Sequence, residues 1–431
     1  MSAPGKRVVI RDAVWGDLEL DPYLVEVLGA PELQRLRRIR QLGTAHLVYP
    51  SANHTRFEHV LGTCHVAGRM LDTLGVGEGE LRRAVLAAAL VHDVGHVPFG
   101  HTFEDERRIF PRHDGPERTR HFLGEGSELG AALARGGVQE ALLASFGAAE
   151  GAAAPLIQDV VAGTICADLL DYLARDAAFT GIRRAYDERL FRYFALSSTD
   201  PREGRLILRL NKGGLRREDA FSEVIHLLRL RYTLTERVYF HHAKVSSGAL
   251  ISKMVERAVP RGLTIEELFP LGDEGLLLHL ATRYAPDDEV LARLLGDFQR
   301  RRLPKRAYVL TRRGAGDELQ SDLIERFHQD RAQREALEAE LEQELGLDPG
   351  DVILYCPSRG MAQKEADVLV EVGRDAPVTL GSLQLAEVDD LLAKHRDLWK
   401  FYVLIAERRL DARPRLAALC QERFGRPSEL E

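Results

Sequence analysis

Residues 84–96 read AVLAAALVHDVGH, an apolar, alanine-rich stretch that ends in a histidine followed by an aspartate. Alanine and leucine favour a helix, and the lack of polar residues before His92 predicts that this helix is buried. An imidazole beside a carboxylate at the end of a buried helix is costly to desolvate unless a partner satisfies both groups. A bound divalent metal ion would satisfy them, so this stretch predicts a metal centre within a helical fold.

Further metal-ligand residues lie upstream and downstream of this stretch. The segment NHTRFEHVLG at 53–62 contains His59 at the start of a helical pattern, and ADLLDYLARD follows at 167–176. In the second segment Asp168, Tyr172 and Asp176 recur every four residues, so a helix places them on one face. A mixed set of imidazoles and carboxylates suits Fe, Mn, Mg, Co, Ni or Zn and does not choose among them. The predicted ligands of one divalent metal are His59, His92, Asp93 and Asp168.

The hydrophobic pattern predicts a mostly α fold with a short N-terminal hairpin at residues 7–20. A strand and a turn are expected at 205–212, where polar and apolar residues alternate before two glycines. Helical patterns are expected at 22–41, 56–74, 80–94, 117–123, 128–134, 137–147, 154–163, 166–178, 188–196, 218–257, 264–269, 273–283 and 287–302.

The pattern changes near Leu303-Pro304, after which strands and helices mix. We therefore expect two domains, 1–302 and 303–431, the second being a small α+β module. A helix at 321–345 with Ser321 as its N-cap is expected in this module. Its other expected elements are strands at 306–311, 351–356, 366–372 and 400–406, and a helix at 385–396.

Composition is that of a globular protein: 431 residues, 45% hydrophobic, 29% charged, with a formal net charge of -7. The four cysteines form no CxxC pair, no apolar run is long enough to span a bilayer, and residues 1–7 lack the apolar region of a signal peptide. These features predict a cytoplasmic protein with no membrane partner. The net charge gives no general attraction to nucleic acid, although the basic run at 300–306 would allow it locally.

The residues that flank the predicted ligands occur in a specific order. Together with the spacing of the ligands, they resemble the deoxynucleoside triphosphate triphosphohydrolase (dNTPase) branch of the HD superfamily of metal-dependent phosphohydrolases. The resemblance runs from about residue 8 to about residue 260 and implies that residues 1–302 form a helical HD domain. The motifs that carry it are IRDAVWG at 10–16, PELQRLRRIRQLG at 31–43, YPSANHTRFEH at 49–59, HDVGHVPFGH at 92–101 and DYLARD at 171–176.

The resemblance also implies roles for further residues. His101 would act near the α-phosphate as an acid or as a helper of the nucleophile, with His113 close by and Asp114 orienting it. Arg56, His96 and Tyr172 would contact phosphates or sugar, Gln41 and Leu42 would pack on the deoxyribose, and Asp176 would bind its 3′-hydroxyl. The implied catalytic set is His96, His101, His113 and Asp114, and the implied substrate-binding set is Gln41, Leu42, Arg56, Tyr172 and Asp176.

Family members bury the helices that carry Gln34, Arg37 and Lys244 between subunits. A homo-oligomer, either a dimer or a tetramer, with a nucleotide activator at the interface is therefore expected. Two positions depart from the animal members of the family. Gly29 replaces an aspartate that reads guanine in the activator, and Leu169 replaces a lysine that grips the substrate phosphates. A strict dependence on GTP is therefore not expected.

We expect hydrolysis of dNTPs to deoxynucleoside and tripolyphosphate. The alternatives are another phosphate ester as substrate (a nucleoside monophosphate, a signalling nucleotide or a single-stranded nucleic acid end) or a nucleotide-sensing regulatory protein. Some residues also have structural interpretations: Arg56 could pair with Glu58, Tyr172 could be a core residue, and His241-His242 could line the pocket or a subunit contact.

Overall fold

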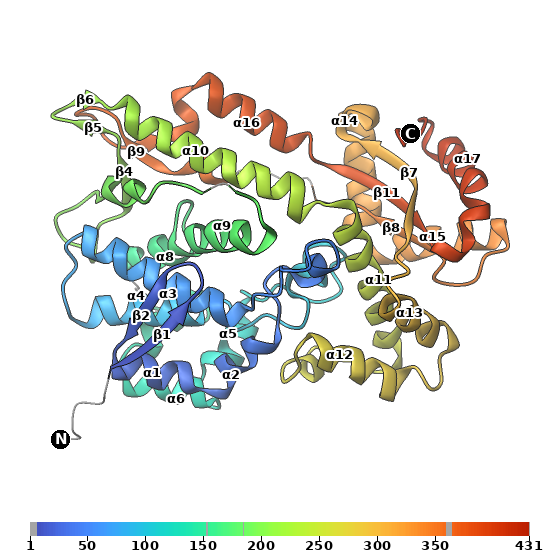
Figure 1. Ribbon diagram of the computed structural model, residues 1–431, viewed down its shortest axis with the longest axis horizontal. Coiled ribbons are helices and arrows are strands. Elements are labelled where there is room, and N and C mark those ends of the chain that lie inside the picture. Colours follow the sequence, from blue (N-terminus) through green and yellow to red (C-terminus); the bar gives the residue numbers. More distant parts are fainter. Residues whose placement is uncertain (1–6, 152–153, 184, 359–363, 431) are drawn as a thin grey trace.

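The computed structural model describes residues 7–151, 154–183, 185–358 and 364–430. Most of the described chain is helical, with a few short strands, so the expected mostly α fold class is confirmed (Figure 1). The expected N-terminal hairpin is also present. Strands β1 (Val8–Asp12) and β2 (Gly16–Leu20) pair antiparallel in a register that sets Asp12 opposite Gly16. No helix in the described ranges combines the length and apolar composition needed to cross a bilayer, and the cytoplasmic location stays a prediction.

The predicted metal ligands lie in a helical bundle in which α3 packs against both α4 and α9. Helix α3 begins with a capping box, because the Thr55 hydroxyl accepts from the Glu58 amide and the Glu58 carboxylate accepts from the Thr55 amide. The α-helices of this bundle are α1 (Pro22–Gly29), α2 (Pro31–Gln34), α3 (Arg56–Thr73), α4 (Glu80–Val91), α5 (Pro116–Leu123), α6 (Glu128–Arg135), α7 (Gln139–Ser145), α8 (Pro155–Ala162) and α9 (Ala167–Thr180).

Three long helical predictions are interrupted in the structure. The pattern at 22–41 breaks before Pro31, because Ala30 is extended with ψ 136°. The pattern at 218–257 divides into α10 (Glu218–Leu234), a π-helical turn and α11 (His242–Ala258), which begins at an N-cap histidine. The expected helix at 188–196 is a 3₁₀ turn followed by strand β3 (Phe194–Leu196). Pro31 marks the first break in the sequence itself. Apolar periodicity continues through the other two breaks and therefore did not predict them.

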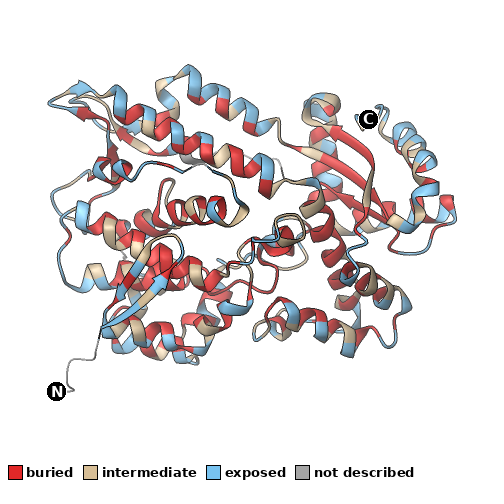
Figure 2. Cartoon of the chain, viewed as in Figure 1, coloured by how far each residue is buried: buried red, intermediate tan, exposed pale blue. Residues whose placement is uncertain are grey.

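Beyond α11, helices α12 (Asp273–His279) and α13 (Glu289–Gln299) lead into the mixed C-terminal region. Its central element is an antiparallel sheet in the order β7-β11-β8. Figure 2 shows that these strands and α11 are mostly buried. The elements of this region are β7 (Lys305–Thr311), α14 (Arg312–Leu323), α15 (Arg331–Leu345), β8 (Val352–Tyr355), β9 (Leu369–Glu371), β10 (Val378–Thr379), α16 (Ala386–Arg396), β11 (Lys400–Ile405) and α17 (Arg413–Phe424).

The helix expected at 321–345 is present as α15, but it begins ten residues later than expected and Ser321 is not its N-cap. Ser321 lies inside α14, where its hydroxyl donates to the carbonyl of Asp317. The following helix, α15, begins instead after Asp330, whose side chain accepts from the Gln333 amide. Helix α17 has no counterpart among the elements expected from the sequence.

Part of the C-terminal region packs on the N-terminal bundle. Strand β9 pairs in parallel with β4 (Leu206–Arg209), and α16 lies alongside α10 (Figure 1). Val388 and Leu391 of α16 belong to the same buried core as the residues of α3 and α9. The division at residue 303 stays a prediction, but its two parts share a sheet.

The close approach of α3 and α9 gives a test of the bundle. A Cβ added at Gly62 would lie 1.8 Å from Asp171 Oδ1 and 2.3 Å from Arg175 Nη2. We expect Gly62→Ala to lower the free energy of unfolding by about 1–3 kcal/mol or more, because the added methyl group overpacks a buried contact. Urea denaturation of the purified variant measures this change.

Gly68→Ala, on the same helix, is the matched control. The nearest atom to its added Cβ would be Leu86 Cδ2 at 3.7 Å, an ordinary contact. The control should raise stability by up to about 1 kcal/mol, since alanine favours a helix more than glycine does. Equal stability of the two variants would contradict the described packing of α3 on α9.

Candidate metal centre and adjoining histidine cluster

His59, on α3, is completely buried and oriented by a carboxylate from α9. Its Nδ1 lies 2.8 Å from Asp171 Oδ2. A carboxylate only accepts, so Nδ1 carries the proton and Nε2 keeps its lone pair. That Nε2 lies 3.0 Å from Asp168 Oδ1 and 3.8 Å from Asp93 Oδ2. His59 therefore points a basic nitrogen at two of the predicted ligands.

His92 is oriented in the same way by a backbone carbonyl. Its Nδ1 lies 2.9 Å from the oxygen of Ala89, within the last turn of α4, and its Nε2 lies 3.6 Å from both Asp93 Oδ1 and Asp168 Oδ1. Ligand atoms of His59, His92 and Asp168 all lie within 4.8 Å of one another. The structure thus brings all four predicted ligands together at the meeting point of α3, α4 and α9.

These residues fit a divalent metal ion. The Nε2 atoms of His59 and His92 are buried, and neither makes a well-formed hydrogen bond to any described residue. Such nitrogens are costly to bury without a partner. Donor atoms about 3–4 Å apart suit one first-row ion bound at about 2.1 Å from each. The set of two imidazoles and two carboxylates leaves the choice of metal open.

Without an ion, the two carboxylates of the site draw protons onto the histidines. Burial opposes protonation of His59, but the adjacent carboxylates of Asp168 and Asp171 raise its pKa to about 10. Burial likewise opposes ionisation of Asp168, and the adjacent imidazoles of His59 and His92 hold its pKa well below the usual range. A cation is favoured at this position, and a bound metal would replace that proton.

A second cluster, made of His96, His101, Glu104 and His113, adjoins the metal ligands. The rings of His96 and His113 stack with centroids 3.6 Å apart, and His101 meets the His96 ring edge-on at 4.7 Å. Asp93 connects the two groups, since its Oδ1 lies 3.3 Å from His96 Nε2 and 3.9 Å from His113 Nε2. Three of the four residues predicted as catalytic therefore lie beside the predicted metal ligands.

Glu104 is the organising residue of this cluster and was missed from the sequence. Its Oε1 lies 2.6 Å from His113 Nδ1 and 2.8 Å from His101 Nδ1. Burial opposes its ionisation, but the hydrogen bonds from these two histidines hold its pKa well below the usual range. The only signal in the sequence was a carboxylate three residues after His101.

Asp114, predicted to orient His113, is bound elsewhere. Its carboxylate makes a two-pronged ion pair with Arg112, at 3.0 and 3.1 Å, and the carboxylate that contacts His113 is that of Glu104. Asp114 points to the guanidinium because the Arg112 side chain, only two residues away, can reach both of its oxygens. The structure thus does not bring Asp114 into the histidine cluster.

His101 is the most accessible member, with 49% of its side chain exposed. Packing against the neighbouring rings removes part of its hydration and disfavours the charged form. Hydrogen bonds to Asp105 and Glu104 outweigh this effect and raise its pKa to about 9. Burial and the nearby Arg56 instead hold the pKa of His96 well below its usual range. The cluster therefore combines a charged, accessible imidazole with a neutral, buried one.

Two of the residues predicted to bind substrate, Arg56 and Tyr172, contact other charged or aromatic side chains. Arg56 is buried and contacts the Asp93 carboxylate, while its Nε has no hydrogen-bond partner among the described residues. The Glu58 carboxylate is used in the helix cap, so the alternative pairing of Arg56 with Glu58 is not observed. Tyr172 is partly buried, and the guanidinium of Arg231 lies 5.1 Å from the centroid of its ring.

Asp176 is held by two residues that the sequence did not single out. His54 Nε2 lies 2.8 Å from its Oδ1, and the Tyr239 hydroxyl donates to its Oδ2 at 2.7 Å. Gln41 is linked to the same region, because its backbone N–H donates to the His54 carbonyl at 3.0 Å. The Oε1 of Gln41 is buried without a partner among the described residues, and Leu42 is buried beside it in the chain.

The residues predicted at a subunit interface are engaged within the chain. Arg37 donates to Gln34 at 2.9 Å, and its guanidinium lies 3.5 Å from the centroid of the Phe57 ring. Lys244 Nζ lies 2.8 Å from Glu106 Oε1. Because these contacts lie within one chain, the predicted subunit interface stays a prediction. His241 and His242 stack on one another with centroids 4.5 Å apart.

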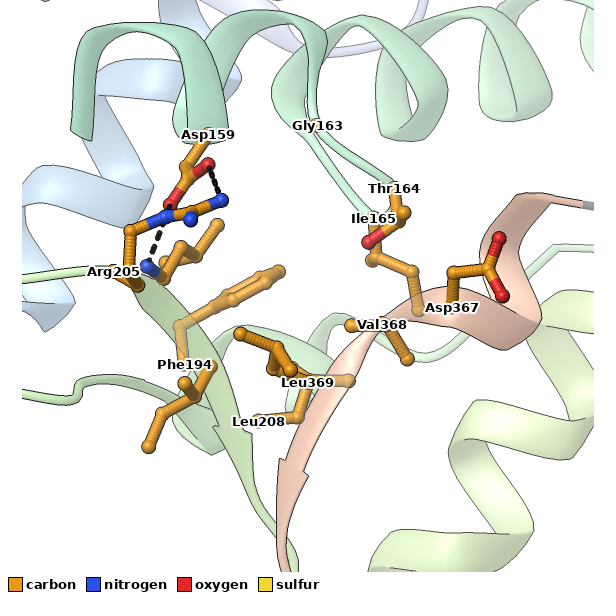
Figure 3. Close-up of a pocket in the computed structure, with 12 residues that line it drawn as sticks. Asp159, Gly163, Thr164, Ile165, Phe194, Arg205, Leu208, Asp367, Val368 and Leu369 are labelled. Atoms are coloured by element: carbon orange, nitrogen blue, oxygen red, sulfur yellow. Dashed lines mark hydrogen bonds and ion pairs between the residues drawn. The ribbon is translucent and has the colours of Figure 1, made fainter. Parts of the chain in front are cut away.

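A small pocket of about 140 Å³ lies away from these residues, between α8 and the sheet that contains β4 and β9 (Figure 3). Its wall includes the ion pair of Asp159 with Arg205, joined at 2.7 and 2.9 Å, and the side chains of Phe194 and Leu208. None of the residues predicted for metal, substrate or catalysis lines it.

Removal of a ligand tests the metal centre. We expect His92→Ala to retain the fold and lose most of its bound metal, measured by elemental analysis after desalting, because one of two imidazole donors is removed. His65→Ala, on the helix that carries His59, is the control and should keep its metal. Full metal occupancy in a His92→Ala/Asp93→Ala double variant would refute this ligand assignment.

Two family models match the chain. The HD domain matches residues 56–176, a range that contains all four predicted ligands, and the HD associated region matches residues 214–418. The fold is similar to a phosphohydrolase from Bacteroides thetaiotaomicron, with a TM-score of 0.69 and 20% identity over 93% of this chain and all of that one.

Curated relatives extend the comparison. The uncharacterized protein MJ1154 of Methanocaldococcus jannaschii is 31% identical over 279 residues, which are 63% of this chain and 54% of that protein. The human deoxynucleoside triphosphate triphosphohydrolase SAMHD1 is 46% identical over 102 residues, which are 22% of this chain and 16% of that protein. The chain thus spans about half the length of MJ1154 and less of SAMHD1. The four residues of the H…HD…D pattern meet at one point of the fold, and the chain contains an HD domain followed by an HD associated region and is similar in sequence to the SAMHD1 proteins.

Proposed function

We propose that this protein hydrolyses deoxynucleoside triphosphates to deoxynucleoside and tripolyphosphate with one divalent metal ion. The observation that carries the proposal is the junction at Asp93, where the metal-ligand set meets the cluster of His96, His101 and Glu104. Similarity to proteins named as deoxynucleoside triphosphate triphosphohydrolases supports the choice of substrate.

The residues of the cluster are suited to proton transfer at a phosphate ester. A divalent ion held by the four ligands would polarise the phosphate. His101, with its pKa of about 9, is protonated at neutral pH and accessible, so it can give a proton to the leaving oxygen. Glu104 and Asp105 hold its ring in place. Arg56 lies beside Asp93, and its Nε, which no described residue pairs with, can bind a phosphate oxygen.

The region around Asp176 is suited to a deoxyribose. Each carboxylate oxygen of Asp176 already accepts one hydrogen bond, from His54 or from Tyr239, and each keeps a lone pair that can accept from a 3′-hydroxyl. Gln41 offers a buried acceptor and Leu42 an apolar surface nearby in the chain. We infer that a sugar held this closely leaves no space for a 2′-hydroxyl.

Product analysis tests the reaction. Metal-loaded protein incubated with each dNTP should release tripolyphosphate and deoxynucleoside, separated by ion-exchange chromatography. We expect His101→Ala to lower kcat by about 10²-fold, since it removes the proton donor and no metal ligand. His279→Ala, which removes a histidine paired with Glu267 at 2.8 Å, should keep full activity.

Other products would redirect the assignment. Pyrophosphate with a deoxynucleoside monophosphate, or hydrolysis confined to monophosphates, signalling nucleotides or nucleic acid ends, would refute the triphosphohydrolase proposal in favour of another phosphohydrolase. Tight nucleotide binding without hydrolysis in any metal would favour a regulatory sensor.

We further propose a homo-oligomer whose activation does not require GTP. Gly29 is exposed, and a Cβ added there would meet nothing within 4 Å, so Gly29→Asp fits without strain. The wild type should hydrolyse dNTPs either independently of GTP or with stimulation by a dNTP that shows no strict guanine preference. The variant should gain a guanine preference of about tenfold or more, because a carboxylate adds a charge-assisted hydrogen bond of about 1.5–3 kcal/mol.

Two measurements decide this pair of proposals. Light scattering with and without nucleotides should show a dimer or tetramer, and a strict monomer would contradict the oligomer. An absolute requirement of the wild type for GTP would contradict the interpretation of Gly29.

A further inference from the structure

Two backbone segments meet beside the histidine cluster. One contains Gln41 and Leu42, and the other leads through Phe99 and Gly100 to His101. Phe99 and Gly100 both have left-handed backbones, with φ of 61° and 59°. A Cβ added at Gly43 would lie 3.2 Å from the Phe99 carbonyl oxygen. The two backbones are therefore in close contact, with no room for a side chain between them.

One buried carboxylate joins these two segments. Asp273, the first residue of α12, is 1% exposed. Its Oδ1 accepts from the Phe99 amide at 2.7 Å, and its Oδ2 accepts from the Arg40 amide at 3.0 Å and from Arg40 Nη1 at 3.3 Å. Because each oxygen holds a different segment, the carboxylate sets the distance between them.

The first segment is also tied to the start of α3. Arg40 forms a β-bridge with Thr55, and the Arg56 amide donates to the Ile39 carbonyl at 2.9 Å. In the second segment the Thr102 hydroxyl donates to the Phe99 carbonyl at 2.9 Å, which stabilises the turn that contains His101. A shift of either segment would thus change the position of His101 relative to Gln41 and Leu42.

We propose that Asp273 is a positioning residue that fixes His101 relative to the segment of Gln41 and Leu42, and thereby sets both turnover and the preference for deoxyribose. This inference rests on the proposed function, in which His101 faces the phosphate and the other segment faces the sugar. Displacement of a reacting group by about 1 Å can cost about 10²-fold in rate, which makes such a link consequential.

Asp273→Asn is the decisive variant. An amide has the shape of a carboxylate but only one acceptor oxygen, so its NH₂ group must face one of the two backbone N–H groups. We expect kcat for dGTP to fall about 10- to 100-fold, KM to change less than threefold, and the ratio of dGTP to GTP hydrolysis to fall. The metal content should equal that of the wild type.

Asp288→Asn is the matched control for loss of a buried aspartate at the start of a helix. Asp288, the N-cap of α13, is 4% exposed, accepts from the Leu291 amide at 3.1 Å and pairs with Arg257 at 2.9 Å. The Asp288→Asn variant should have lower thermal stability, with kcat and sugar preference unchanged. Equal kinetic effects of the two variants, or wild-type kinetics in Asp273→Asn, would overturn the proposal.

Two further measurements keep the outcome clear. If Asp273→Asn does not fold, Asp273→Ser, which avoids the opposed N–H groups, carries the same comparison. Hydrogen exchange of the wild type should show slow exchange of the Phe99 and Arg40 amides, and fast exchange of either would overturn the link. If the wild type hydrolyses no dNTP, the proposed function fails, whereas hydrogen exchange still decides whether Asp273 holds both segments.

Discussion

The candidate metal centre depends on the hydrogen bonds made by the Asp171 carboxylate, which is buried between α3 and α9. This carboxylate accepts hydrogen bonds from His59 at 2.8 Å, from Arg175 at 2.9 Å through two nitrogens, and from the Trp15 indole at 2.6 Å. Arg175 continues to Asp12 of the N-terminal hairpin at 2.8 Å. A buried charge is tolerated only when it is fully paired, so these contacts must form together. The hairpin, the two helices and the orientation of His59 are thereby coupled.

The same principle explains how the site divides its charges. Asp171 lies behind His59 and makes its outer nitrogen basic, whereas Glu104 contacts both His101 and His113 and raises the pKa of His101. Asp93 lies between the two groups and is also bound by Arg56. A carboxylate that accepts a hydrogen bond from an imidazole raises the basicity of the ring. The chain can therefore place histidines proposed to bind a metal next to a histidine proposed to donate a proton.

The C-terminal region is connected to the histidine cluster by a second buried network. Arg107, three residues after Glu104, donates to Glu256 of α11 at 2.6 and 2.9 Å and to Glu338 of α15 at 3.1 Å. The Arg334 guanidinium of α15 donates to the Arg107 carbonyl at 2.9 Å. Removing one partner would leave an uncompensated buried charge, which is strongly destabilising. The loop that carries Glu104 is therefore supported by elements more than a hundred residues away.

The sequence by itself determined the helical class and the hairpin, and it singled out four candidate metal ligands that the fold brings together. Each depends on local information: the apolar stretch before His92, the hydrophobic pattern at residues 7–20, and the four-residue spacing after Asp168. Tertiary structure decided the supporting partners, because His59 meets Asp171 across 112 residues and His54 meets Asp176 across 122. Periodicity describes which face of an element is buried, but not which distant side chain lies opposite it. It also cannot show where a helix breaks when apolar residues continue through the break, or that β9 would pair with β4, since both outcomes depend on packing between elements that are far apart in the chain.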